Sequence, residues 1–87
     1  MEKYEITFKK SVAKDFRVIP KKDVKKILDR INALSENPRT EGCVKLTGSN
    51  FYRVRQGNYR IIYEIRDNIL VVTVIKIGNR ADVYKGN

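Results

Sequence analysis

Residues 51–77 read FYRVRQGNYRIIYEIRDNILVVTVIKI, and this stretch decides the fold. It contains three runs rich in β-branched and aromatic residues, which is typical of β-strands. Two-residue turn signals, Gly57-Asn58 and Asp67-Asn68, separate the runs. The pattern therefore predicts a three-stranded antiparallel meander with strands at 51–56, 59–66 and 69–77.

The first turn decides which side chains of the meander share a face. With residues 57–58 in the turn, Arg55 lies opposite Arg60, and Arg53 lies opposite Ile62. Because side chains alternate along a strand, one face is apolar and the other is charged. We expect the apolar face to bury the core and the charged face to receive a partner. The apolar face comprises Tyr52, Val54, Ile61, Tyr63, Ile65, Leu70, Val72 and Val74, and the charged face comprises Arg53, Arg55, Arg60, Glu64 and Arg66 beside Ile62, Val71 and Ile75.

The chain before the meander predicts one strand and two helices. Residues 4–8 alternate apolar and polar, as in a half-buried strand. Ser11 is a candidate N-cap for a short helix that stops at Pro20. Apolar side chains then recur at helical spacing through Leu34, and Asn37-Pro38 ends this second helix.

Residues 39–50 lack periodicity and are predicted to form a loop. The element order is then strand, two helices and three strands. It indicates a single α+β domain over residues 1–87, with the two-helix hairpin packed on one face of a mostly antiparallel sheet.

Composition excludes several kinds of chemistry. The chain has 19 Lys and Arg against 10 Asp and Glu, which leaves a net charge of +9, with no histidine and a single cysteine, Cys43. An imidazole base, a Ser–His or Cys–His pair, an internal disulfide and a thiolate or imidazole metal site are therefore excluded. We expect no metal and no cofactor, and interpret Cys43 as an incidental small apolar residue.

The excess positive charge favours a polyanionic partner, with nucleic acid ahead of a membrane. No apolar run approaches the roughly 20 residues of a membrane span, and Met1-Glu2-Lys3-Tyr4 lacks the apolar core of a signal peptide. The expected location is the cytoplasm.

Two interpretations of the charged face stay open. Arg55 opposite Arg60 is a like-charge pair, which destabilises a sheet unless an anion or an acid lies between the two side chains. One interpretation is a set of solvated arginines, partly neutralised by Glu64. The other is a phosphate cradle, since the guanidinium fork grips phosphate oxygens two at a time. The stripe Lys22, Lys26 and Arg30 on the second helix is likewise either a solvated face or a docking surface for RNA.

The segment YRVRQGNYRIIYEI at residues 52–65 resembles the RelE branch of the RelE/ParE toxin superfamily. The resemblance continues through residues 71–74, Ile77-Gly78-Asn79-Arg80 and Val83-Tyr84, and it includes the loop residues Lys45, Leu46 and Gly48. It spans nearly the whole chain and implies the family's microbial ribonuclease-like fold.

The resemblance implies the toxin of a type II toxin–antitoxin system. Such a toxin is a ribosome-dependent, metal-independent endoribonuclease that enters the ribosomal A site, contacts rRNA, cuts mRNA there and so inhibits translation. A RelB-like antitoxin neutralises it. The catalytic residues implied are Arg53, Arg55, Arg60, Arg80 and Tyr84, and the predicted RNA contacts are Lys22, Lys26, Arg30, Lys45, Lys76 and Lys85.

Proton transfer is the least determined part of this chemistry. Arginine is a poor base, so Tyr84, with its phenol activated by the surrounding guanidinium groups, is the leading candidate. Glu64, Lys45, Lys76 and Lys85 are the alternatives, although a pairing of Glu64 with a neighbouring arginine is the simpler role. Two rival functions stay open: a ParE-like inhibitor of DNA gyrase, and a non-catalytic basic module that binds RNA.

Overall fold

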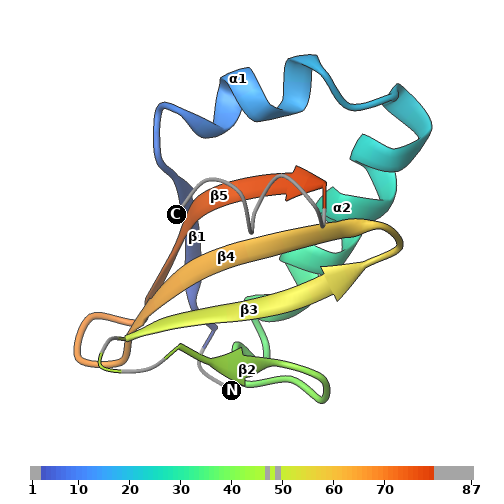
Figure 1. Cartoon of the computed structure of the whole chain (residues 1–87). Coiled ribbons are helices and arrows are strands. Elements are labelled where there is room, and N and C mark those ends of the chain that lie inside the picture. Colours follow the sequence, from blue (N-terminus) through green and yellow to red (C-terminus); the bar gives the residue numbers. More distant parts are fainter. Residues whose placement is uncertain (1–2, 47, 49, 80–87) are drawn as a thin grey trace.

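The structure of the protein is a computed structural model that describes residues 3–46, 48 and 50–79 (Figure 1). Five strands and two helices make up this part of the chain. Their bounds are β1 Glu5–Phe8, α1 Val12–Arg17, α2 Lys21–Leu34, β2 Val44–Lys45, β3 Phe51–Gln56, β4 Tyr59–Arg66 and β5 Val71–Asn79.

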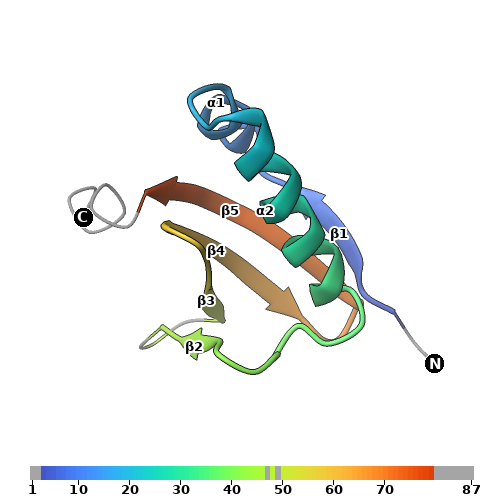
Figure 2. The same ribbon diagram turned by 90° about the vertical axis from the view of Figure 1, so that its right-hand side faces the viewer.

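The strands form one mixed sheet in the order β1-β5-β4-β3-β2. Strand β1 runs parallel to β5, and the other pairs are antiparallel. Both helices contribute buried side chains to one core against this sheet, and Figure 2 shows α2 lying across one of its faces. The α+β class, the meander and the helix-covered face are therefore confirmed. None of the described helices is long and apolar enough to cross a membrane.

The hairpin of β3 and β4 has the predicted register. Arg55 pairs with Arg60, and Arg53 pairs with Ile62. Gly57 has φ of 61°, the left-handed conformation that a tight hairpin turn demands of its first central residue. Because this turn holds two residues, side chains at positions 52, 54, 61 and 63 all reach the core, as predicted.

The second hairpin differs from the prediction. Arg66 pairs with Val71, so the loop is residues 67–70 rather than Asp67-Asn68 alone, and β5 begins two residues later than expected. Leu70, predicted for the core face, lies in this loop with φ of 54°.

A β-bulge interrupts the pairing of β4 with β5. Ile62 pairs with Lys76 whereas Tyr63 pairs with Val74, which leaves Ile75 as the extra residue on β5. Strict alternation therefore fails after Val74, and Ile77 returns to the core.

Residues 39–50 are not wholly a loop, because Val44–Lys45 forms the short edge strand β2. Val44 pairs with Arg53, and Lys45 pairs with Tyr52. A two-residue strand with no apolar alternation carries no sequence signal, and only its pairing with β3 makes it a strand.

The helices begin and end close to the predicted positions. Helix α2 starts directly after Pro20 and ends at Leu34, and its apolar stripe buries Ile27, Ile31 and Leu34. Helix α1 is shorter than predicted and ends at Arg17. The predicted cap by Ser11 is not made, because this residue has helical φ and ψ and its side chain forms no capping hydrogen bond.

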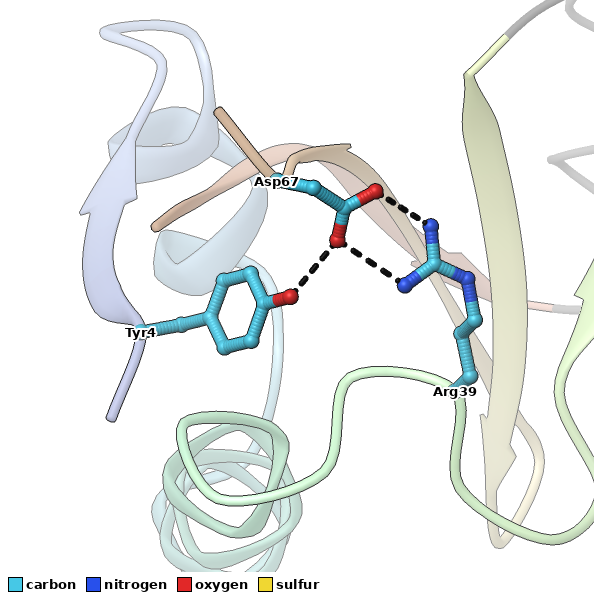
Figure 3. A network of polar contacts seen from close by, with 3 residues as sticks. All are labelled: Tyr4, Arg39 and Asp67. Carbon is cyan, nitrogen blue, oxygen red and sulfur yellow. Dashed lines mark hydrogen bonds and ion pairs between the residues drawn. The ribbon is translucent and has the colours of Figure 1, made fainter. Parts of the chain in front are cut away.

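A polar cluster ties three distant segments together at the far end of the sheet (Figure 3). The Arg39 guanidinium donates two hydrogen bonds to the Asp67 carboxylate, at 3.0 and 2.8 Å, and the Tyr4 hydroxyl donates a third at 2.6 Å. Arg39 also lies over the Tyr52 ring, 5.3 Å from its centroid. The cluster joins the segment before β1, the loop after α2 and the turn between β4 and β5.

These hydrogen bonds, above all those from Arg39, hold the pKa of Asp67 down at about 2. A carboxyl whose pKa is lower in the folded state stabilises the fold above its unfolded pKa of about 4, and that contribution disappears as the pH falls through about 2.

We therefore expect Asp67→Asn to lower the melting temperature at pH 7. The difference in melting temperature between the variant and the native protein should shrink as the pH falls from about 4 to about 2. Thermal unfolding followed by circular dichroism across this range measures both effects. A gap that persists unchanged at pH 2 would show that the carboxylate charge is not what stabilises the cluster.

Candidate nucleic-acid interface

The face of the sheet opposite the helices carries the charged side chains of the β3–β4 hairpin. Val54, Ile61 and Tyr63 point into the core, so their neighbours in sequence point to the other face. No described helix lies on this face, which we call the open face. Its hairpin residues are Phe51, Arg53 and Arg55 on β3 and Arg60, Ile62, Glu64 and Arg66 on β4.

Three arginines meet in one groove at the edge of this hairpin. The groove has a volume of about 320 Å³ and is lined by Arg30, Gly42, Val44, Arg53 and Arg55. Arg30 reaches it from α2, and Arg53 and Arg55 reach it from β3. None of the lining residues is acidic, so the three guanidinium groups concentrate positive charge in the groove.

Arg30 is held in place by the loop before β2. Its Nη2 donates a hydrogen bond to the Glu41 carbonyl oxygen at 3.3 Å. A side chain at Gly42, where φ is 89°, would meet this same nitrogen at 3.9 Å. The Arg30 Nε atom is buried and has no hydrogen-bond partner among the described residues. A buried donor without a partner costs roughly 1–3 kcal/mol, which an incoming anion would recover.

The grouping of Arg30 with Arg53 and Arg55 was missed from the sequence, where Arg30 belonged only to the helical stripe. Periodicity places Arg30 on a helix face but does not show which strand that face approaches. The short strand β2 leaves the outer edge of β3 uncovered beyond Arg53, and Arg30 reaches this position.

Arg60 lies on the open face, as the register predicts, yet its side chain is completely buried, with 0% exposure. Strand alternation predicts the face of a side chain but not whether other atoms cover it. The residues opposite Arg60 on the neighbouring strands are Arg55 and Gly78. Withdrawing a guanidinium from water costs several kcal/mol unless it gains compensating interactions, so this position is demanding for the fold. The catalytic role of Arg60 stays a prediction.

The remaining predicted RNA contacts are spread over the surface. Lys26 lines a groove of about 200 Å³ with Asp23, Tyr59 and the Gly57-Asn58 turn, one helical turn from Arg30. Lys22 and Lys45 are exposed. Lys76 is also exposed, and its Nζ lies 3.8 Å from an Asp15 carboxylate oxygen, so it has a structural partner on α1.

Arg80, Tyr84 and Lys85 lie outside the described residues, so their predicted roles are neither supported nor contradicted. Among the tyrosines that are described, burial raises the pKa of Tyr59 and of Tyr63, which makes both weaker candidates for a general base. Glu64 accepts a hydrogen bond from Arg66 Nε at 3.1 Å, the simpler of its two predicted roles.

Metal binding finds no support in the described part of the chain, where no group of three or more His, Cys, Asp and Glu side chains comes together. The groove of Arg30, Arg53 and Arg55 offers only cationic hydrogen-bond donors. Such a site binds phosphate oxygens and stabilises negative charge that develops on them.

Comparison with known proteins shows similarity along nearly the whole chain. Residues 6–84 match the family described as the ParE toxin of the type II toxin–antitoxin system, parDE. The putative toxin RelE1 of Methanocaldococcus jannaschii is 31% identical over 87 residues, which cover 95% of this chain and 97% of the relative.

Solved toxin structures have the same fold. The archaeal RelE–RelB complex from Pyrococcus horikoshii OT3 matches with a TM-score of 0.80 and 28% identity, covering 88% of this chain and 94% of that chain. The isolated RelE toxin of E. coli matches with a TM-score of 0.76 and 27% identity, covering 95% of this chain and 93% of that chain.

The arginine groove predicts how RNA binding depends on salt. Binding of a single strand loses affinity with a slope of about −0.7 in log K against log salt for each phosphate contacted. We expect Arg30→Ala, Arg53→Ala and Arg55→Ala each to make this slope shallower by about that amount. Fluorescence anisotropy of a labelled oligoribonucleotide at several KCl concentrations measures it.

Arg17→Ala is the matched control, because Arg17 is an exposed arginine on α1 that lines no groove with the hairpin. If all four variants change the slope equally, binding reflects the overall charge of the protein, and the groove has no special role.

Proposed function

Because the chain belongs to the ParE toxin family of type II toxin–antitoxin systems and is a RelE-like toxin, we propose that it is a ribosome-dependent endoribonuclease that cuts mRNA in the ribosomal A site. The observation that carries the proposal is the groove in which Arg30, Arg53 and Arg55 meet without an acidic side chain. This arrangement matches the negative charge that accumulates on a phosphate during RNA cleavage.

The proposed reaction needs neither a metal nor a cofactor. The 2′-hydroxyl oxygen attacks the adjacent phosphorus in line, a general base takes its proton, and the bond from phosphorus to the 5′-oxygen breaks. A general acid returns a proton to that oxygen. The products are a 2′,3′-cyclic phosphate and a free 5′-hydroxyl, so atoms and charge balance.

The arginines act on the phosphate in this proposal. Arg53 and Arg55 donate hydrogen bonds to the non-bridging oxygens, and Arg60 and Arg80 complete the stabilisation of the transition state. Tyr84 serves as the general base. Lys22, Lys26 and Arg30, with Lys45, Lys76 and Lys85, contact the RNA backbone of the message and of the ribosome.

The proposed partner is a RelB-like antitoxin, and the structural neighbours support it because several are complexes of RelE with RelB. A protein with a net charge of +9 attracts acidic segments. Leu28 on α2 stays 36% exposed, which gives an amphipathic segment an apolar contact on the helices. The proposed action on the ribosome implies a cytoplasmic location.

Two rivals remain to be separated by experiment. The matching family is named for ParE, which specifically favours a gyrase inhibitor as the second candidate. A gyrase inhibitor would block supercoiling and cut no message. A non-catalytic module would bind ribosomes or RNA and leave both message and supercoiling intact.

The proposal predicts message cleavage on programmed ribosomes and none on naked RNA. Primer extension measures it. Removing one preorganised donor to the transition-state charge typically costs about 100- to 1,000-fold in rate, so we expect such losses from Arg55→Ala and Arg80→Ala, with ribosome binding retained. Tyr84→Phe should abolish cleavage if the phenol is the base.

Arg17→Ala serves again as the control and should cut at the native rate. If the native protein cuts no message with or without ribosomes, the nuclease proposal fails. A gyrase supercoiling assay on the same preparation then decides between the two rivals.

A further inference from the structure

We propose that Phe51, together with the groove beside it, is a subsite for one nucleobase of the RNA strand whose phosphates lie at Arg53 and Arg55. The inference rests on the proposed function and deepens it, since it assigns a base-binding position next to the phosphate-binding groove.

Phe51 is in the right place for this role. It lies on the open face, two residues before Arg53 on the same strand, and residues two apart on a strand are about 6.7 Å apart along its axis. Phe51 stays 36% exposed, although it opens a strand whose next apolar residues, Tyr52 and Val54, are buried. An aromatic ring beside arginines on a sheet face is how many proteins bind single-stranded RNA, with bases stacked on the ring and phosphates on the cations.

The groove next to Phe51 differs in charge from the arginine groove. Glu64 is the residue directly across from Phe51 in the sheet. Glu64 lines a groove of about 470 Å³ that runs to the β4–β5 turn, with Asn50, Ile65, Arg66, Asp67, Asn68 and Ile69. Its two carboxylates are each paired with an arginine, Glu64 with Arg66 and Asp67 with Arg39, so it has no net charge to attract a phosphate, whereas the arginine groove attracts one.

The groups in this groove suit the edge of a base. One carboxylate oxygen of Glu64 accepts a hydrogen bond from Arg66 Nε at 3.1 Å, and the second oxygen can accept further hydrogen bonds. A carboxylate accepts hydrogen bonds from the amino groups of bases, an arginine donates to purine acceptors, and an asparagine such as Asn50 does both. Donors and acceptors therefore stand beside a stacking surface, which a nucleobase requires.

The same charges argue against an acidic antitoxin segment as the occupant. Because Glu64 is paired with Arg66 and Asp67 with Arg39, an acidic segment gains no net attraction in this groove, while an uncharged base needs none. A phosphate bound by Arg53 and Arg55 neutralises the arginine groove. An uncharged base on Phe51 suits the paired charges of the neighbouring groove.

The first test uses the absence of tryptophan from the chain. Phe51→Trp places a single indole at the proposed stacking position. Phe8→Trp is the matched control, because Phe8 is 44% exposed but contacts Phe16 on the helix side, 6.3 Å between ring centroids. The probe is a short oligoribonucleotide with 2′-O-methyl riboses, which cannot be cleaved, at low salt.

We expect saturable quenching of the indole in Phe51→Trp and little in Phe8→Trp. When the bases of the oligonucleotide are replaced one at a time by abasic residues, the quenching should disappear for one position of the RNA only. The proposal would be overturned if the RNA binds, as measured by anisotropy, without quenching the indole of Phe51→Trp. Quenching that persists with every abasic oligonucleotide, or RNA that does not bind the protein at all, would overturn it too.

The second test follows cleavage on programmed ribosomes. Loss of one base–aromatic stack should slow cleavage by roughly tenfold in Phe51→Leu, while Phe51→Trp, which still offers a stacking ring, should lose much less and Phe8→Leu is unaffected. Glu64→Gln should change which bases are preferred at the cut, because it exchanges an acceptor-only group for one that also donates. A native rate and native base preference in Phe51→Leu would overturn the subsite.

The two tests separate the two proposals. If the native protein cuts no message, the nuclease proposal fails, and the quenching experiment still decides whether Phe51 stacks on a base.

Discussion

The register of the β3–β4 hairpin is the constraint on which the rest of the structure depends. Gly57 takes a left-handed conformation, so the turn closes with two residues, and every side chain of both strands is assigned to a face. A slip of one residue would place Arg53 and Arg55 in the core and expose Val54 and Tyr52. The hydrophobic core and the arginine groove therefore come from the same register, and neither can change without the other.

This arrangement concentrates positive charge on the hairpin. Arg55 faces Arg60 across the ladder, and Arg30 is brought to Arg53 and Arg55 from a different element. Arg60 is in addition withdrawn from water. Clustered and buried charges cost stability unless other interactions offset them, and proteins keep such features mainly at functional sites. The open face thus combines a groove lined by three arginines with a groove of paired charges beside Phe51.

The polar cluster at the β4–β5 turn helps to position the open face. Arg39, Asp67 and Tyr4 join the loop after α2 to the β4–β5 turn and to the segment before β1. The same loop continues to Glu41, whose carbonyl oxygen accepts a hydrogen bond from Arg30. This polar cluster, which lies away from the arginine groove, therefore anchors the loop that positions Arg30.

The sequence by itself determined the α+β class, the helix from Lys21 to Leu34 and the pairing of β3 with β4, because periodicity and a two-residue turn are local signals. It also assigned Arg53 and Arg55 to one face. Only the tertiary structure decided that Arg30 joins them, that Arg60 is buried, that β2 pairs with β3 and that a bulge at Ile75 returns Ile77 to the core. These features depend on how distant segments pack, and residues far apart in the chain leave no periodic trace of their contacts.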